Sequence, residues 1–161
     1  MFHHTIGKVI YYIMYRKHTV RPMQAADKPC VMDMMRTFYA SPAVSTNGSE
    51  EIFSADIDAC VSDSPYAEGY VIECDGKAAG YAMLAKSWST EFGKPCIWIE
   101  DIYLQDAFRG KGLGKLFFDF LTEKYAGCLF RLEVEADNAQ ALQLYKKCGF
   151  DFLPYLEMKK L

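Results

Sequence analysis

The sequence RGKGLGK at residues 109–115 decides the fold prediction. It follows residues 96–104, which are apolar on both faces as in a central β-strand. It precedes residues 113–125, whose apolar side chains recur at helical spacing. Glycines let a backbone approach a ligand closely, and the first turn of a helix offers N–H groups and the positive end of a dipole. Because three basic side chains lie in the same stretch, the turn suits the oxygens of a phosphate group.

Two common nucleotide-binding motifs do not fit this turn. A Walker A loop needs four residues between its glycines and a hydroxyl after its lysine, whereas three residues separate Gly110 from Gly114 and Leu116 replaces the hydroxyl. A dinucleotide fingerprint fits Gly110 and Gly112, but Lys115 takes the place of the third glycine. A tight strand-to-helix turn without a ligand, and a nucleotide-phosphate site of another kind, both stay open.

The rest of the chain predicts an α+β (mixed α/β) protein with one central sheet. Asp75-Gly76 is typical of a type I′ turn between two antiparallel strands. Asn138 fits the N-cap of a helix that Gly149 ends. The predicted strands are residues 18–23, 70–74, 79–85, 96–104 and 128–135, the predicted helices are residues 25–39, 49–61, 113–125 and 139–148, and residues 150–160 are expected to form one or two closing strands.

Composition narrows the class of protein. The chain has 161 residues, enough for one domain, and its 51% hydrophobic and 24% charged residues are typical of a globular fold. The net charge of -3 lacks the basic excess of nucleic-acid-binding proteins. The apolar run at residues 9–15 is too short to span a bilayer. We therefore expect neither a nucleic-acid nor a membrane partner.

The first 15 residues are set apart as an N-terminal extension, and residues 16–161 as the domain. Val9–Ile13 fits an extra strand, but Met14 also fits an initiator, which would place residues 1–13 upstream of the native start. Both readings stay open. The six cysteines show neither a CxxC pair nor zinc spacing. They predict reduced, mostly buried cysteines, a cytoplasmic protein and no metal.

Three motifs, taken in order, resemble the GCN5-related N-acetyltransferase (GNAT) superfamily from about His18 to the end of the chain. Residues 109–114 fit its [QR]-x-x-G-x-[GA] loop, and Asn138 with LYKKCGF at residues 144–150 resembles its usual ending. IEDIYL at residues 99–104 resembles, more weakly, the diamine (spermidine/spermine-type) branch. The resemblance implies a single GNAT-like domain, with a mostly antiparallel mixed sheet that splays near the cofactor and about four flanking helices.

The resemblance also implies which residues bind acetyl-CoA. Backbone amides of the turn would bind the pyrophosphate, and backbone groups of the preceding strand would bind the pantetheine and the acetyl carbonyl. Asn138 would cap its helix and bind the pantetheine region. The implied cofactor-binding residues are Ile102, Tyr103, Leu104, Arg109, Gly110, Lys111, Gly112, Leu113, Gly114, Lys115, Asn138 and Tyr145.

Two side chains are the implied catalytic residues. Tyr145 matches the tyrosine that protonates the departing thiolate, although a core tyrosine is the alternative. Most of an alkyl amine is protonated at neutral pH, so a carboxylate is expected to accept its proton, and analogy with the diamine branch favours Glu100. Adjacent strand residues point to opposite faces, so we expect only one of Glu100 and Asp101 to face the reaction.

The sequence thus predicts an acetyl-CoA-dependent N-acetyltransferase in which a primary amine attacks the thioester directly. The sequence shows no Cys/His pair that could form a covalent intermediate, so we expect none. The identity of the amine stays open, and a homodimer is plausible. The alternative function is a non-catalytic module that binds or senses acyl-CoA.

Overall fold

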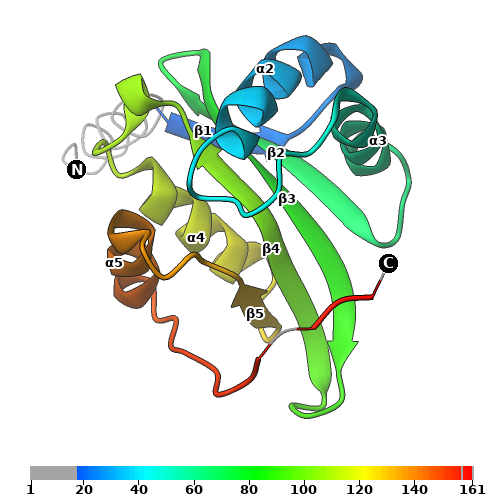
Figure 1. Cartoon of the computed structure of the whole chain (residues 1–161), viewed down its shortest axis with the longest axis vertical. Coiled ribbons are helices and arrows are strands. Elements are labelled where there is room, and N and C mark those ends of the chain that lie inside the picture. Colours follow the sequence, from blue (N-terminus) through cyan, green and yellow to red (C-terminus); the bar gives the residue numbers. More distant parts are fainter. Residues whose placement is uncertain (1–17, 157, 161) are drawn as a thin grey trace, which may run out of the picture.

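The computed structural model describes residues 18–156 and 158–160, and these form one five-stranded sheet (Figure 1). The strand order is β1-β2-β3-β4-β5, antiparallel from β1 to β4 and parallel between β4 and β5. The predicted mixed, mostly antiparallel sheet is therefore confirmed. The strands are β1 (His18–Pro22), β2 (Ala67–Cys74), β3 (Lys77–Ser89), β4 (Lys94–Leu104) and β5 (Leu129–Leu132). The suggested extension at residues 1–15, with its possible strand, lies outside the described residues.

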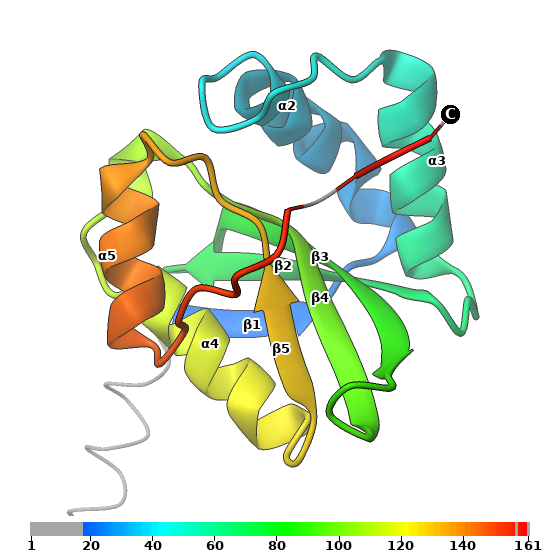
Figure 2. The ribbon, with the colours of Figure 1, turned by 60° about the horizontal axis from the view of Figure 1, so that its bottom comes forward.

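Helices cover both faces of the sheet (Figure 2). α2 and α3 lie on one face, and α4 and α5 lie on the other. The side chain of Ser49 caps the start of α3 by accepting a hydrogen bond from the Ile52 N–H, at 3.3 Å. The helices of the described residues are α2 (Lys28–Tyr39), α3 (Glu50–Val61), α4 (Leu113–Lys124) and α5 (Ala139–Lys147), with short 3-10 helices at Ala25–Asp27 and Asp106–Phe108.

Each face of the sheet buries its own apolar core. Ile97 of β4 packs with Phe117 of α4 in one core. Tyr81 of β3 packs with Met35 of α2 and Ile57 of α3 in the other. Each of these five side chains is at most 3% exposed. Because both faces are covered, the sheet forms the middle of three layers.

An irregularity in β4 changes the face that its side chains reach. Two consecutive residues of β3 pair with Ile99 and Asp101, which leaves Glu100 as an extra residue in a β-bulge. Ile99 packs into the core with α4, whereas Tyr103 packs into the core with α2 and α3. Regular alternation would place both on the same face, since they are four positions apart. The bulge therefore turns Asp101 and Tyr103 toward α2 and α3, while Ile102 and Leu104 pack against the core with α4.

The hairpin between β2 and β3 confirms the predicted turn. Asp75 and Gly76 are its two central residues, with φ of +50° and +75°, as a type I′ turn requires. The cysteines agree with the prediction only in part. All six are free, but Cys30 is exposed, and only Cys74 and Cys96 are buried.

The C-terminal tail does not form the predicted closing strands. None of the described residues from 150 to 160 lies in a strand. Pro154 has no N–H group, and the N–H of Phe152 donates to the Asp151 carboxylate at 2.8 Å. Two of its N–H donors are thus unavailable to a ladder, and the segment crosses outside β5 as irregular chain (Figure 2).

The described residues contain neither a membrane-spanning helix nor a metal-binding group of side chains. No helix among them has the length and apolar character needed to cross a bilayer. Within the same part of the chain, no group of three or more His, Cys, Asp or Glu side chains is arranged to hold a metal ion.

We predict that Gly80→Ala disrupts the contact between β3 and β4. A Cβ at Gly80 would collide with the carbonyl oxygen of Tyr103 and lie 2.7 Å from a methyl carbon of Leu104. Backbone cannot move aside cheaply, so we expect a loss of about 3 kcal/mol in the free energy of unfolding, measured by urea denaturation. Gly76→Ala, in open space but at positive φ, should cost only about 1 kcal/mol. Equal losses would contradict this account.

Candidate active site

The sheet opens between β4 and β5. Their ladder begins at Cys96 and Leu129 and ends at Ile99 and Leu132. β4 continues to Leu104, still paired with β3, while the chain after Leu132 leaves the sheet. The predicted strand at residues 128–135 is therefore shorter than expected. Beyond the last pair, one edge of β4 faces an opening rather than a neighbouring strand.

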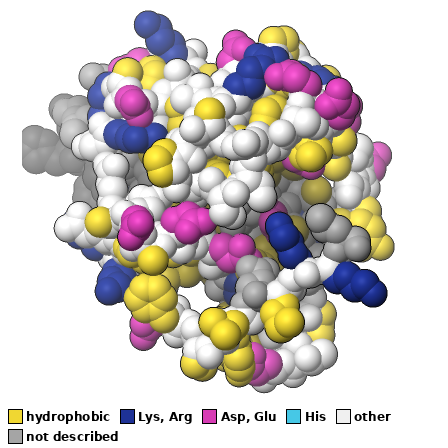
Figure 3. All heavy atoms as spheres, viewed as in Figure 1, with side chains coloured by type: hydrophobic (Ala, Val, Ile, Leu, Met, Phe, Trp, Pro, Cys, Tyr) yellow, Lys and Arg dark blue, Asp and Glu magenta, His cyan; other side chains and the backbone are white. Residues whose placement is uncertain are grey.

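A cavity of about 760 Å³ occupies this opening, between α2, α3, the end of β4 and the segment after β5. In Figure 3, acidic side chains gather around the hollow in the middle of the face. Carboxylates outnumber basic groups in its wall. The carboxylates are Asp56, Glu100, Asp101, Glu133 and Glu135, and Lys159 is the Lys or Arg side chain found there among the described residues.

Asp101 is the most buried carboxylate in the wall, with 6% of its surface exposed. Its two oxygens accept hydrogen bonds from the phenols of Tyr39 (3.1 Å) and Tyr81 (2.9 Å). Its pKa is raised to about 6. Burial is the main cause, the nearby charges of Asp56 and Glu100 also raise the pKa, and the hydrogen bonds from both phenols lower it. The carboxylate is thus held in place by neutral donors rather than by a cation.

Glu100 and Asp101 both line this cavity, so the expectation that only one would face the site is wrong. The bulge at Glu100 is the reason, because the alternation of side chains between faces fails there. Glu100 itself is exposed to solvent. It lies close enough to affect the pKa of Asp101 and of Tyr39.

The sequence reasoning missed three residues of the cavity: Tyr39, Asp56 and Tyr81. Tyr39 and Tyr81 fall within a predicted helix and a predicted strand, and no local pattern shows that they meet Asp101. A signal for Asp56 did exist. It lies four residues from both Ile52 and Cys60 in a predicted helix, and a carboxylate between apolar residues at helical spacing is unusual.

The glycine turn exposes its backbone at the start of α4. Gly110 and Gly112 have φ of +74° and +81°, and a side chain built at either would meet no protein atom within 4 Å. The N–H groups in the first turn of α4 have no acceptor within the helix. Gly114 serves packing instead, because a Cβ there would lie 2.6 Å from Leu144 of α5. The open backbone therefore fits a phosphate ligand.

The basic side chains of the turn contact the protein. Arg109 Nε donates to the Leu104 carbonyl oxygen at 3.0 Å, and its guanidinium pairs with Asp106 at 2.8 Å. The Lys111 ammonium lies 5.1 Å from the ring centroid of Phe108. These contacts tie the turn to the end of β4 and to the residues just before it.

The residues at the end of β4 bury their side chains in the cores, whereas one edge of their backbone has no neighbouring strand. Tyr103 is 7% exposed, and Ile102 and Leu104 are partly buried against the core. Their backbones pair with β3 on one side only. Asn138 caps α5, because its side chain accepts from the Ala141 N–H at 3.2 Å. The cap is confirmed.

Tyr145 lies on α5 beside a second, larger cavity of about 970 Å³. Burial, and then the nearby Cys148, raise its pKa to about 12, so the phenol is protonated at neutral pH. Its ring packs edge-on against Phe118, with centroids 5.7 Å apart, and lies 6.0 Å from Phe150.

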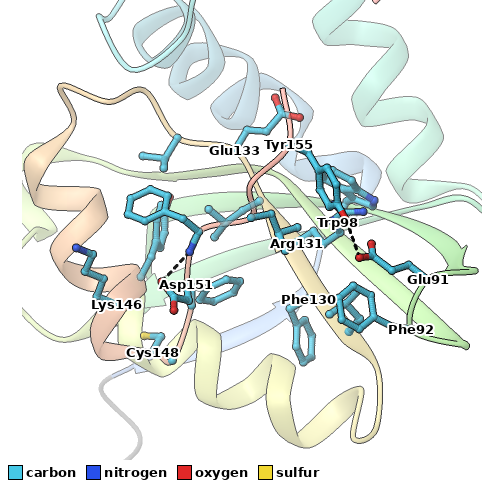
Figure 4. Close-up of a pocket in the computed structure, with 18 of the residues that line it drawn as sticks. Glu91, Phe92, Trp98, Phe130, Arg131, Glu133, Lys146, Cys148, Asp151 and Tyr155 are labelled. Carbon is cyan, nitrogen blue, oxygen red and sulfur yellow. Dashed lines mark hydrogen bonds between the residues drawn. The ribbon is translucent and has the colours of Figure 1, made fainter. Parts of the chain in front are cut away.

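The larger cavity lies between β5, α5 and the C-terminal tail (Figure 4). Tyr155 of the tail donates to Glu91 at 2.9 Å across its mouth. Glu100 does not line this cavity, and Tyr145 does not line the acidic one. The two cavities share Glu133 and Val134, so the segment that follows β5 lines both of them.

Comparison with known proteins identifies the family. A model described as the Acetyltransferase (GNAT) family matches residues 32–150. The chain belongs to the GNAT family. A putative [ribosomal protein bS18]-alanine N-acetyltransferase of Bacillus subtilis (strain 168) is 31% identical over 140 residues, which cover 84% of this chain and 82% of that protein.

One partial sequence match and one structural match add to this comparison. Streptothricin acetyltransferase of Streptomyces lavendulae is 37% identical over 86 residues, which are 50% of this GNAT chain but only 42% of that protein. The structure of AAC(6')-Iy with the bisubstrate analog CoA-S-monomethyl-acetylneamine has a TM-score of 0.72 at 14% identity, covering 89% of this chain and 97% of the other. The fold is therefore the GNAT fold, as the resemblance implied.

We predict that Asp101→Asn changes how stability depends on pH. Asp101 has a pKa of about 6 in the folded protein and an ordinary value of 3.8 in the unfolded chain. Between these values the folded state keeps a proton that the unfolded state has lost, so rising pH favours unfolding. The wild type should lose about 3 kcal/mol relative to the variant between pH 4 and pH 7, measured by chemical denaturation. A pH-independent difference would contradict this.

Proposed function

We propose that this GNAT protein transfers the acetyl group of acetyl-CoA to a primary amine, with both substrates bound together. The observation that carries the proposal is the opening between β4 and β5, where an unpaired strand edge lies beside a cavity lined by carboxylates and leads along the chain to an exposed glycine turn. The relatives named as acetyltransferases support the reaction, and the fold neighbour solved with a CoA-containing analog supports the cosubstrate.

Acetyl-CoA would bind along the backbone of this opening. The N–H groups of residues 109–115 would hold the pyrophosphate, favoured by the positive end of the α4 dipole. The free edge of Ile102–Leu104 would hold the pantetheine arm, and one of its N–H groups would stabilise the oxyanion that forms on the thioester. Asn138, at the start of α5, would complete the pantetheine site.

The chemistry follows from the positions of two ionisable side chains. Glu100 accepts a proton from the ammonium group of the acceptor, directly or through water. The neutral nitrogen then forms a bond to the thioester carbon, which places a positive charge on the nitrogen. The C–S bond breaks as the tetrahedral species collapses, and the nitrogen loses its second proton to water to give the neutral amide. Tyr145 donates its phenolic proton to the departing thiolate. Its pKa of about 12 suits an acid that must stay protonated at neutral pH.

The two cavities suggest where the thioester lies. Tyr145 lines one cavity and Glu100 the other, and Glu133 and Val134 line both. A thioester placed beside this shared segment would have the proton donor on one side and the proton acceptor on the other. Thiol and amine would then approach from opposite directions.

We predict that Gly112→Val weakens acetyl-CoA binding at least about tenfold in calorimetry, because a branched side chain would cover the exposed backbone of the turn. Gly127→Val is the matched control. Gly127 also has positive φ, at +86°, and open space around it, but it lies between α4 and β5. Both variants carry similar backbone strain, so only a difference in binding supports the site. Equal binding by the two variants would place the cofactor elsewhere.

We predict that Tyr145→Phe and Glu100→Gln reduce turnover with different pH dependence. Each should lower kcat by about 100-fold at pH 7, measured as thiol release with a panel of amines. Raising the pH to 10 supplies neutral amine without a base, so Glu100→Gln should recover activity. Tyr145→Phe should not recover activity at pH 10, because phenylalanine has no proton to donate to the thiolate at any pH.

The same assay separates the proposal from its alternative. Tight CoA binding with turnover at the background rate for every amine, and no effect of Tyr145→Phe, would identify a module that binds acyl-CoA without catalysis. If the wild type neither bound CoA nor acetylated any amine, both functions would be rejected.

A further inference from the structure

The C-terminal tail, residues 150–160, passes from one cavity to the other. Tyr155 and Met158 line the larger cavity, and the residue after Met158, Lys159, lines the acidic one. Figure 2 shows the red tail running past β5 toward α3, the helix that supplies Asp56 to the acidic wall. The side chains of Leu156 and Met158 are 95% and 93% exposed. The apolar cores therefore do not hold this part of the tail.

Side-chain contacts earlier in the tail hold it beside the cavities. The Tyr155 phenol donates to the Glu91 carboxylate at 2.9 Å, and the Lys146 ammonium lies 5.4 Å from the ring centroid of Phe152. A hydrogen bond of this kind contributes about 1 kcal/mol. Contacts of this strength restrain the path of the tail without fixing each of its side chains.

Lys159 brings a primary amine into the acidic cavity. It is the Lys or Arg side chain that lines this cavity within the described part of the chain, and Glu100 and Asp101 line the same space. Carboxylates attract an ammonium group, and the four-carbon stem of a lysine is flexible. The tail thus places a group of the class that the proposed reaction consumes in the cavity of the proposed base.

The segment expected beside the thioester also lines the space that contains Lys159. Glu133 and Val134 line both cavities, and the proposed function places the thioester next to them. An amine tethered to the same chain has an effective concentration in the millimolar range, on the order of that of a short flexible linker. Lys159 would therefore compete with a free amine that is present below that concentration.

We propose that the protein acetylates its own Lys159, within the same chain. The inference rests on the proposed function and goes beyond it, because it assigns a modification site on the protein itself. Glu100 accepts a proton from the Lys159 ammonium, and Nζ then bonds to the thioester carbon. The C–S bond breaks, Tyr145 protonates the departing thiolate, and the nitrogen loses its second proton to water. The products are Nε-acetyllysine and CoA.

The position of Lys159 limits the reaction to one transfer per chain. Acetylation removes the positive charge of the side chain, so the carboxylates no longer attract it. Lys160, the next residue, lines neither cavity, and we expect it to stay unmodified. Uncatalysed acetylation by acetyl-CoA would instead follow exposure, and Lys159 and Lys160 are both exposed.

The experiment incubates the full chain with acetyl-CoA at pH 7, follows the intact mass and maps the modified residue by peptide mass spectrometry. We expect the mass of one acetyl group to be added, on Lys159. Lys159→Arg should abolish this gain, and Lys160→Arg is the matched control, which should leave it unchanged. Equal acetylation of Lys159 and Lys160, or an undiminished gain in Lys159→Arg, would overturn the inference.

The variants of the proposed catalytic residues test whether the transfer is enzymatic. Glu100→Gln and Tyr145→Phe should each slow the acetylation of Lys159 about 100-fold at pH 7. A rate that neither substitution changes would identify a chemical reaction with acetyl-CoA and would overturn the inference.

A mixture of two proteins tests whether the transfer stays within one chain. Isotope-labelled Glu100→Gln, which keeps Lys159, is incubated with unlabelled wild type, and the two masses are followed separately. Transfer within a chain predicts that the labelled protein gains its acetyl group no faster in the mixture than alone. Faster acetylation in the mixture would overturn the assignment to a single chain.

Turnover of free amines, measured on the same preparation, distinguishes failure of this inference from failure of the proposed function. Acetylation of free amines with Lys159 left unmodified would overturn the inference and leave the proposed function intact. If the wild type acetylated neither a free amine nor Lys159, both would be overturned.

Discussion

The bulge at Glu100 is the constraint on which the site depends. One extra residue in β4 turns Asp101 away from the core of α4 and toward α2 and α3, where the phenols of Tyr39 and Tyr81 hold it. The ladder with β5 ends at the residue just before the bulge, Ile99. A single local irregularity thus both opens the sheet and places carboxylates beside the opening.

This arrangement lowers the stability of the fold at neutral pH. Ionised Asp101 costs about 3 kcal/mol relative to an ordinary aspartate, as its raised pKa requires. That is a large part of the net stability of a typical domain, about 5–15 kcal/mol. The two apolar cores on either side of the sheet make this cost tolerable. A group that destabilises its own fold and is held rigidly at a cavity is typical of a functional position.

The sequence predicted those features that depend on local backbone chemistry. The glycine turn, the Asp75-Gly76 hairpin and the Asn138 cap follow from short-range preferences, and the structure has each of them. Contacts between distant segments were out of reach. Tyr39 and Asp101 are 62 residues apart, and no local pattern encodes their hydrogen bond. The bulge made the argument from strand alternation fail, and the tail, where the Phe152 N–H bonds to Asp151 and Pro154 has no N–H, does not form the strand that its sequence suggested.

The position of the two cavities on either side of Glu133 and Val134 has a consequence for the order of events. Under the proposed function, a donor bound at the glycine turn would leave the acidic cavity open, since none of residues 109–115 lines it, so an acceptor could enter without the donor leaving. A covalent enzyme intermediate would be needed only if the two substrates had to use one cavity in turn. Separate binding regions would therefore favour direct transfer within a ternary complex, and this argument is independent of the absence of a Cys/His pair in the sequence.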